Sequence, residues 1–185
     1  MGSLGEDFDP ALAQARAGKA PGFEALWRAY AGSVAGYLRL QGASDPDAVT
    51  SEVFLGAFRG LSGFEGNEER FRAWLFTIAH RRLVDDRRFT SRRPVTSAFE
   101  ETWVGPAGPS AEDDAMRQAS AARVEEQCAS LPSDQREVIL LRVVAELTVE
   151  EVAEAIGRSP GAVKALQHRA LVSLRKTISL KGVPQ

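Results

Sequence analysis

The sequence contains little cysteine and histidine, and it has no long apolar run. Cys128 is the single cysteine among 185 residues, so no disulfide can form within the chain. With only His80 and His168 as histidine ligands, we expect neither a structural zinc site nor another metal centre. No apolar run approaches the roughly 18 residues that a membrane helix needs, and the N-terminal residues lack the basic start and apolar block of a signal peptide. These absences favour a protein of the reducing cytoplasm without membrane insertion.

The motifs of an enzyme are absent as well. His80 with Asp85 or Asp86, and Glu52 with Asp45, are the pairs that could act as acid and base. No nucleophile motif, phosphate-binding loop or metal-ligand spacing accompanies them. Asp85 and Asp86 lie among arginines, and we expect them to pair with these. The sequence therefore predicts no enzyme activity, no catalytic residue and no cofactor.

The charges are distributed in blocks along the chain. The net charge is −2, yet residues 70–93 carry eight basic and two acidic side chains, and residues 158–185 carry six basic and no acidic ones. The stretches 1–69, 94–130 and 131–157 are all net acidic. Two basic blocks fit a polyanion held at two places, while the acidic remainder limits non-specific binding. The alternative is that both blocks are solvated helix faces.

Apolar residues recur at helical spacing nearly throughout, and no alternating strand pattern stands out, so we predict an all-α fold. In the first predicted helix, the apolar stripe that we expect to be buried includes Phe23 and Trp27. Residues 91–115, between two helical parts, are rich in proline, glycine and serine, which is typical of a flexible linker. The predicted helices are 23–38, 46–61, 70–89, 116–131, one that ends near Ala145, 148–156 and 160–175. The predicted organisation is an N-terminal extension (1–22), a small helical domain (23–90), a flexible acidic linker (91–115) and a second small helical domain (116–185).

The second domain has the features of a helix-turn-helix. Thr148 and Glu151 have the spacing of a capping box at a helix start. Gly157 can adopt the left-handed conformation that ends a helix, and Ser159 with Pro160 can begin the next one. The stripe that faces the first helix then consists of Val163, Leu166, Ala170 and Leu174, and the cations and histidine outside it are Lys164, His168, Arg169 and Arg175. This arrangement is typical of a helix that enters the major groove, and the alternative is an ordinary helical hairpin with a basic outer face.

The basic helix of the first domain mixes aromatic residues with arginines. We expect Phe71 and Trp74 to pack in the core, because they share a stripe with Ile78. Phe64 and Asn67 lie in the preceding glycine-rich loop, where we expect them to be exposed. An exposed aromatic ring and an amide could form a pocket for an extruded base.

Together the two domains resemble the extracytoplasmic-function (group 4) sigma factors of bacterial RNA polymerase, over about residues 23–176. "FRAWLFTIAHRRLVDDRR" resembles region 2.3–2.4 of that family, and "LPSDQREVILLRVVAELTVEEVAEAIGRSPGAVKALQHRALVSLRK" resembles region 4. The resemblance implies a promoter-specificity subunit that directs core polymerase to specific promoters and assists promoter melting. The partners that it implies are the clamp of the largest polymerase subunit, the flap of the second, promoter DNA and an anti-sigma factor.

The resemblance also assigns roles to residues of this chain. It implies contacts with core polymerase by Asp47, Glu52, Leu55 and Arg59. It implies contacts with the −10 element by Phe64, Asn67, Ile78, His80, Arg81, Arg87 and Arg88. It implies contacts with the −35 element by Ser159, Pro160, Gly161, Lys164, Ala165, His168, Arg169 and Arg175.

Several positions depart from the family pattern, namely Ala48 and Ser51 in the docking helix, His80-Arg81 in the −10 helix and Ala165-Leu166 in the −35 helix. Two other functions are open on the residues alone. One is a stand-alone helix-turn-helix regulator that binds DNA as a dimer, and the other is an RNA-binding protein of the antitermination type. A lone cysteine among apolar positions, such as Cys128, is more often buried filler than a redox switch.

Overall fold

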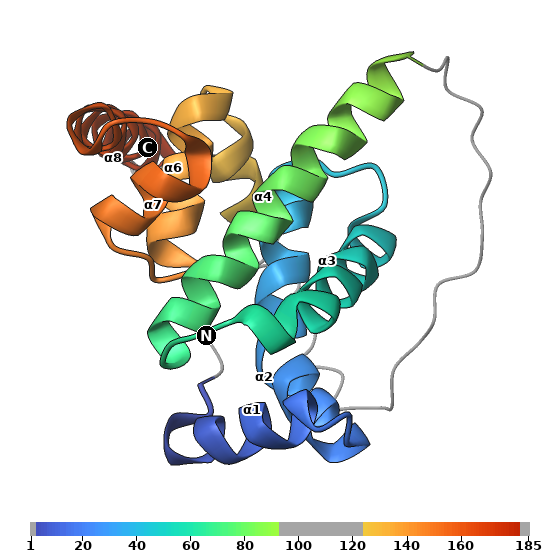
Figure 1. Ribbon diagram of the computed structural model, residues 1–185. Helices are drawn as coiled ribbons and strands as arrows, with labels where there is room; N and C mark the ends of the chain where they lie inside the picture. The colour runs from blue at the N-terminus through green and yellow to red at the C-terminus, as the bar shows by residue number, and fades with distance from the viewer. Residues whose placement is uncertain (1–2, 93–123, 182–185) are drawn as a thin grey trace, which may run out of the picture.

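The structure is a computed structural model that describes residues 3–92 and 124–181 (Figure 1). Every regular element in these two ranges is helical, which confirms the predicted all-α fold. The elements are η1 (Gly5–Asp7), α1 (Phe8–Arg16), α2 (Ala20–Leu40), α3 (Pro46–Gly60), η2 (Leu61–Gly63), α4 (Glu68–Arg92), a helical stretch at 124–129, α6 (Ser133–Val143), α7 (Val149–Ile156) and α8 (Pro160–Lys181). The predicted linker lies outside the described residues except for 91–92, which belong to α4, and so does the part of the predicted helix 116–131 that precedes residue 124.

The ends of the central helices follow from single residues at the reversal between α2 and α3. Gly42 takes a φ of 77°, and Ala43 N–H donates to Leu38 O at 3.0 Å, so α2 ends in a left-handed cap. The Asp45 carboxylate accepts a hydrogen bond from Ala48 N–H at 2.9 Å, and Pro46 occupies the first position of α3. The reversal between α2 and α3 is therefore determined locally.

The structure adds a helix, α1, within the predicted N-terminal extension, where no element was expected. Its inner face buries Phe8, Ala11, Leu12 and Ala15. A Cβ atom at Gly22 of α2 would lie 2.3 Å from Ala15 N and 2.6 Å from Ala11 O, so only glycine permits the two helices to approach this closely. The extension is therefore an integral part of the first domain.

Glu68, the first residue of α4, connects this N-terminal segment to the domain. Its carboxylate accepts hydrogen bonds from Ser3 Oγ, from the backbone N–H groups of Leu4 (2.7 Å) and Gly5 (2.9 Å), and from the Tyr30 hydroxyl. Burial alone would raise the pKa of Glu68, but these hydrogen bonds outweigh it and hold the pKa below its ordinary value of 4.5. The ionised carboxylate is therefore the form that anchors the segment.

We predict that Glu68→Gln removes an acid-sensitive part of the stability. A carboxyl group whose pKa is lower in the folded state stabilises the fold above its unfolded pKa, and this contribution is lost as the pH falls through the folded pKa. At neutral pH the variant should lose roughly 1.5–3 kcal/mol, the range for hydrogen bonds to a charged group. Denaturant unfolding of both proteins should show this difference shrinking as the pH falls below 4.5, and a difference that does not vary with pH would contradict it.

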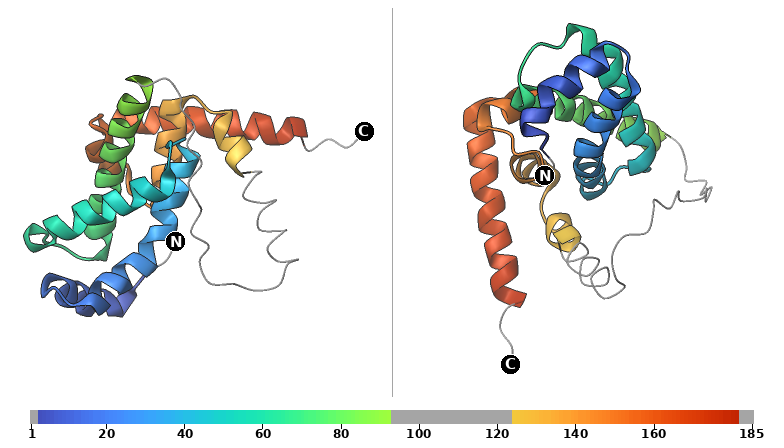
Figure 2. Two further views of the ribbon diagram at one scale, coloured as in Figure 1. Left: turned by 90° about the vertical axis from the view of Figure 1, so that its right-hand side faces the viewer. Right: turned by 90° about the horizontal axis from the view of Figure 1, so that it is seen from below.

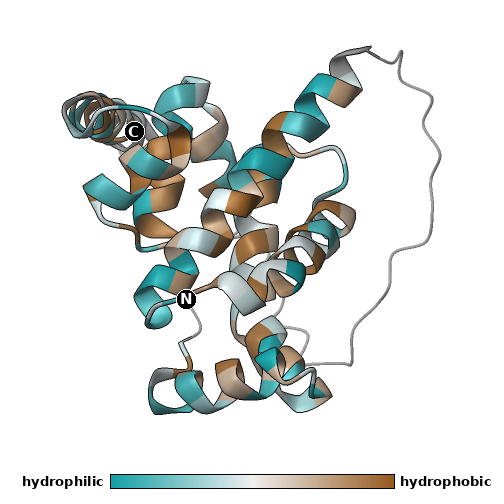
Figure 3. Cartoon of the chain, in the orientation of Figure 1, coloured by the Kyte–Doolittle hydropathy of each residue, from teal (hydrophilic) through white to brown (hydrophobic). Residues whose placement is uncertain are grey.

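The core of the first domain lies between α2, α3 and α4. Tyr30, Tyr37, Phe54 and Phe76 are each 0 or 1% exposed. Figure 3 shows apolar and polar segments alternating along α3 and α4, as expected for helices that bury one side. Phe71 is fully buried and Trp74 is partly buried, which confirms their predicted packing. The other predicted stripe residue, Trp27, is 41% exposed, so its assignment to the buried face is wrong.

The two domains pack directly against each other. Helix α4 lies between α3 on one side and α7 on the other, and α6 contacts α2 (Figure 1). One continuous cluster of buried residues joins Leu75 and Phe76 of the first domain with Val138, Leu141 and Val152 of the second. Helix α8 projects away from this body (Figure 2). A tethered pair of separate domains was expected, whereas the described residues form one body.

Two smaller observations complete the fold. Cys128 is buried, which raises the pKa of its thiol and agrees with the prediction of buried filler. In the described parts of the chain, no helix combines the length and the apolar character that would let it cross a membrane.

Candidate nucleic-acid interfaces

The helix-turn-helix of the second domain is formed by α7 and α8. The predicted capping box is present: Glu151 N–H donates to Thr148 Oγ1 at 3.2 Å, and Thr148 N–H donates to the Glu151 carboxylate at 2.7 Å. Gly157 ends α7 with a φ of 65°, and Ala162 N–H donates to Ser159 Oγ at 3.2 Å at the start of α8. The turn is thus fixed by the side chains and the glycine that the sequence singled out.

The outer face of α8 carries the predicted cations. Val163, Leu166 and Ala170 are buried, and Leu174 packs beside them, which confirms the predicted inner stripe. The predicted −35 residues are all exposed: Ser159, Pro160, Gly161, Lys164, Ala165, His168, Arg169 and Arg175. Of the two departures in this helix, Ala165 thus faces outwards, whereas Leu166 faces the core. The resulting surface is cationic, with small residues near the helix start.

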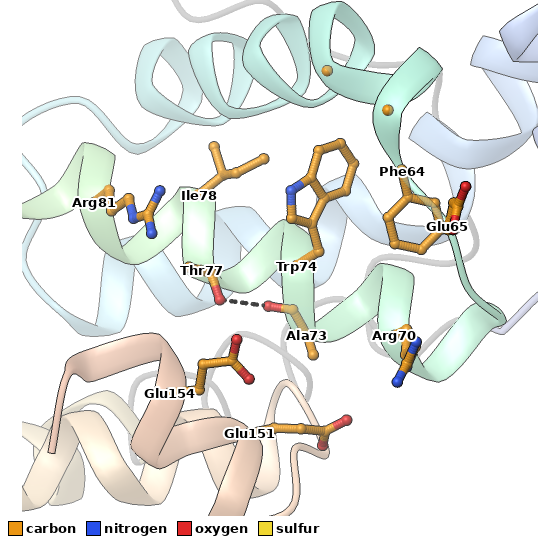
Figure 4. Close-up of a pocket in the computed structure, with 12 residues that line it drawn as sticks. Phe64, Glu65, Arg70, Ala73, Trp74, Thr77, Ile78, Arg81, Glu151 and Glu154 are labelled. Carbon is orange, nitrogen blue, oxygen red and sulfur yellow. Dashed lines mark hydrogen bonds between the residues drawn. The ribbon is translucent and has the colours of Figure 1, made fainter.

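The basic helix α4 borders a hollow of about 800 Å³. Arg70, Trp74, Ile78 and Arg81 line it from α4, and Gly63, Phe64 and Glu65 line it from the preceding loop. The remaining lining includes Glu151 and Glu154 of α7, which Figure 4 places on one side of α4. The hollow therefore combines aromatic and aliphatic groups with arginines, and carboxylates of the second domain border it.

The expected exposure of Phe64 is wrong. The ring is 7% exposed, stacks on Trp74 with centroids 5.1 Å apart, and meets the edge of Phe71 at 5.5 Å. Asn67 is exposed as expected, but its side-chain oxygen accepts a hydrogen bond from Arg70 N–H at 3.1 Å and so caps α4. Phe64 therefore forms the floor of the hollow, and its outward neighbours in the loop are Gly63 and Glu65.

Two polar contacts join α4 to the second domain. His80 Nδ1 lies 2.7 Å from Glu137 Oε1, and only 16% and 13% of the two side chains are exposed. Arg72 Nη1 lies 3.3 Å from Glu146 Oε2. His80 was predicted to contact DNA, and in the described structure it faces the protein's own second domain. The acidic block 131–157 is therefore the neighbour of the basic block 70–93.

The remaining predicted −10 residues differ in their exposure and in their contacts. Arg81 is exposed, and Ile78 is half-buried at the edge of the hollow. Arg87 donates to Gln41 O at 2.5 Å and to Gln41 Oε1 at 3.0 Å, so its guanidinium caps α2 instead of facing outwards. Arg88 lies 3.8 Å from Asp85, as the expected pairing of Asp85 with arginine required.

Asp86, the other carboxylate expected among the arginines, accepts hydrogen bonds from Ser44 N–H at 2.9 Å and from the Ser44 hydroxyl. This contact joins α4 to the reversal between α2 and α3. Asp86 and Arg87, both near the charged end of α4, therefore stabilise the first domain.

The outer face of α3 carries the residues that were predicted to bind polymerase. Asp47, Glu52, Leu55 and Arg59 are all exposed, and Leu55 is 50% exposed. Arg82 of α4 lies 3.8 Å from Glu52. Beside this face lies an apolar hollow of about 520 Å³, lined in part by Phe23, Trp27, Ala31 and Phe58. The sequence pattern missed this hollow because it assigned Phe23 and Trp27 to the buried stripe.

Comparison with known proteins gives matches for both domains. The family described as Sigma-70 region 2 matches residues 26–93, and the family described as Sigma-70, region 4 matches residues 121–174. The ECF RNA polymerase sigma factor SigD of Mycobacterium tuberculosis is 33% identical over 190 residues, which cover 98% of this chain and 89% of SigD.

Solved structures of similar proteins share the fold of this chain. The structure of CnrH in complex with the cytosolic domain of CnrY matches with a TM-score of 0.65 and 26% identity, covering 92% of this chain and 96% of that one. The sigma factor RpoE of Bartonella quintana, solved in complex with the anti-sigma factor NepR, has the same fold with a TM-score of 0.62 and 19% identity, covering 85% and 96% of the two chains.

Proposed function

This chain belongs to the extracytoplasmic-function sigma factors of bacterial RNA polymerase, and from that membership we propose which of its surfaces performs each part of promoter recognition. A sigma factor directs core polymerase to specific promoters and assists in melting them. It makes and breaks no covalent bond, so the chain acts through binding alone. We place it in the cytoplasm, where the polymerase works. The two other functions that the sequence left open, a stand-alone regulator and an RNA-binding protein, have no support.

We propose that the outer face of α3 docks on the clamp of the largest polymerase subunit. Its exposed Asp47, Glu52, Leu55 and Arg59 combine charge with one large apolar side chain. The apolar hollow beside Trp27 extends this surface. A mixed face of this kind is typical of a specific protein interface, which has an apolar centre and a polar rim. The second domain would bind the flap of the second subunit.

We propose that α4 and the loop before it bind the −10 element as a single strand. The hollow offers Trp74, which Phe64 supports from below, for stacking, and Arg70 and Arg81 for the backbone. Because His80 lies against Glu137, and because Glu151 and Glu154 border the hollow, DNA can occupy this face only after the second domain moves away. Binding of core polymerase would supply the free energy for that separation.

We propose that α8 reads the −35 element in the major groove. Lys164 and Arg169 would hold phosphates, whereas Ala165 and Gly161 allow the helix to approach the bases closely. The domain limits 23–90 and 116–185 would separate the two DNA-binding units, and the segment between them would connect them across the polymerase. Two tethered weak contacts then act at a high effective concentration.

The observation that carries the proposal is the pairing, in one chain, of a region 2 match with a region 4 match, each with a basic helix at its C-terminal end. We predict that the purified chain, added to core polymerase from the same organism, starts transcripts at a defined site on genomic promoter fragments. Runoff transcription followed by mapping of the 5′ ends would measure this. Core polymerase alone is the control, and the same transcripts without the added chain would contradict the function.

We also propose that an anti-sigma factor holds the chain in the arrangement described above. CnrH, which is similar to this chain over almost its whole length, was solved in complex with the cytosolic domain of CnrY. A pull-down from the native cell, probed for polymerase subunits and for a small inhibitor, would test this.

A further inference from the structure

The loop that borders the −10 hollow is held from behind by the N-terminal helix. We infer that α1, through Arg16, is a positioning element for base capture, so that the N-terminal segment determines how well this sigma factor discriminates the extruded base. The inference rests on the proposed role of the hollow in binding the −10 strand. It concerns a part of the chain to which neither the motifs nor the family resemblance assigned a role.

Arg16, the last residue of α1, contacts two backbone carbonyl groups of the loop. Its Nε–H donates to Leu61 O at 3.3 Å, and its Nη2 donates to Phe64 O. Leu61 begins the short 3-10 turn η2, and Phe64 is the residue that follows it. One planar guanidinium thus spans both ends of this turn, which fixes the distance between them.

Contacts between aromatic rings also connect α1 to the hollow. Phe8 of α1 meets Phe71 of α4 with ring centroids 5.6 Å apart. Phe71 meets the edge of Phe64 at 5.5 Å, and Phe64 stacks on Trp74 at 5.1 Å. Since Phe64 and Trp74 line the hollow and Phe8 does not, the aromatic row runs from α1 to the floor of the hollow. A displacement of α1 would therefore be transmitted to the surface on which a base would stack.

Helix α1 is itself fixed at two independent points. Its contact with α2 leaves no room for a Cβ atom at Gly22, where backbone atoms of α1 lie 2.3 and 2.6 Å from the position of such an atom. At the N-terminal side of α1, the backbone N–H groups of Leu4 and Gly5 donate hydrogen bonds to the Glu68 carboxylate. The helix that carries Arg16 is therefore preorganised relative to α4, and a preorganised site loses less free energy on binding than a mobile one.

Arg16→Ala tests the inference in holoenzyme reconstituted from the full chain and core polymerase. The probe is a pool of single-stranded DNA oligonucleotides randomised over the non-template −10 region, and the readout is the ratio of bound sequences at each position. We expect the preference for the captured base to fall about tenfold, equivalent to about 1.4 kcal/mol. Arg16→Lys, which keeps one cationic donor, should fall between the alanine variant and the parent.

The base ratio separates positioning from stability, because a smaller folded fraction lowers all binding equally and leaves the ratio unchanged. Arg39→Ala is the matched control, since Arg39 is an exposed arginine at the far end of α2. Gly22→Ala is a second route to the same result, because it displaces α1, and Arg16 with it, without changing the Arg16 side chain. Core binding and −35-dependent binding should stay at the parental level in each variant.

The outcomes are distinguishable. A reduced base preference in Arg16→Ala, with partial recovery in Arg16→Lys and no change in Arg39→Ala, supports the inference. Parental base preference in both Arg16→Ala and Gly22→Ala overturns it, and so does an equal loss at every base. If the parent holoenzyme itself shows no base preference and opens no promoter, the proposed function fails instead.

Discussion

Replacing Lys164 and Arg169 together with alanine is expected to reduce −35-dependent initiation by roughly a hundredfold or more. Both side chains are exposed on the outer face of α8, while Val163 and Ala170 of the same helix are buried. Each charge-assisted contact with a phosphate contributes about 1.5 kcal/mol or more, so the loss of two contacts amounts to at least about 3 kcal/mol. Because neither side chain belongs to the core, the fold should be unaffected.

The salt dependence provides a second and independent measurement. Each phosphate contact that is lost should reduce the slope of log binding constant against log salt by about 0.9. The double variant should therefore differ from the parent by about 1.8 in slope when holoenzyme binding to promoter fragments is measured from low to physiological salt.

Charge-preserving exchanges are the matched control. Lys164→Arg with Arg169→Lys keeps both cations on α8 and should keep the parental slope. A promoter with a scrambled −35 element keeps its phosphates, so the alanine variant should bind it more weakly than the parent by a similar factor. Equal binding of parent and alanine variant to the intact promoter at every salt concentration would exclude a role for these two residues.

Joining the two domains covalently is expected to abolish promoter opening. In a Cys128→Ala background, Arg72→Cys and Glu146→Cys place thiols on α4 and beside α7, at positions whose native side chains lie 3.3 Å apart. A flexible bismaleimide can then bridge them. The bridged chain should leave the −10 thymines unreactive to permanganate, whereas the unbridged double variant should open the promoter as the parent does.

The reason is that one surface has two competing occupants. His80 and the hollow beside Arg81 face Glu137, Glu151 and Glu154 in the free chain, and the same surface is proposed to receive the −10 strand. Carboxylates there would repel phosphates, so a bridge that keeps them in place excludes DNA both sterically and electrostatically.

Single-cysteine variants treated with the same reagent control for modification of either residue alone. A reagent with a cleavable spacer should restore opening once the bridge is cut. Permanganate reactivity of the bridged protein equal to that of the parent would show that α4 binds the −10 strand without separation of the domains, and the proposed competition would be wrong.

The parts of the fold that the sequence predicted are those that depend on neighbouring residues. Asp45 with Pro46, Thr148 with Glu151, and Gly157 each act within a few positions, so their caps could be read directly from the chain. The inner stripe of α8 was predictable for the same reason, since helical spacing alone places its residues on one side.

The parts that were missed depend on residues far apart in the chain. Phe64 looked exposed because its loop is rich in glycine, but Phe71 and Trp74 enclose it, and α1 supports it through Arg16. Helix α1 itself gave a weak signal, because much of its buried face consists of small alanines. The contact between the domains joins residues on either side of the predicted linker, and no local pattern records such a pair.

The pair formed by His80 and Glu137 also constrains how this sigma factor can diverge. If residue 80 must fit a carboxylate in the free chain and DNA in the holoenzyme, a substitution there changes two equilibria at once. Selection for a new promoter would then act on position 137 as well, although that residue lies in the other domain. Related chains that differ at one of these positions should differ at the other, and a −10 helix grafted from a relative should function fully only when its own counterpart of Glu137 is transferred with it.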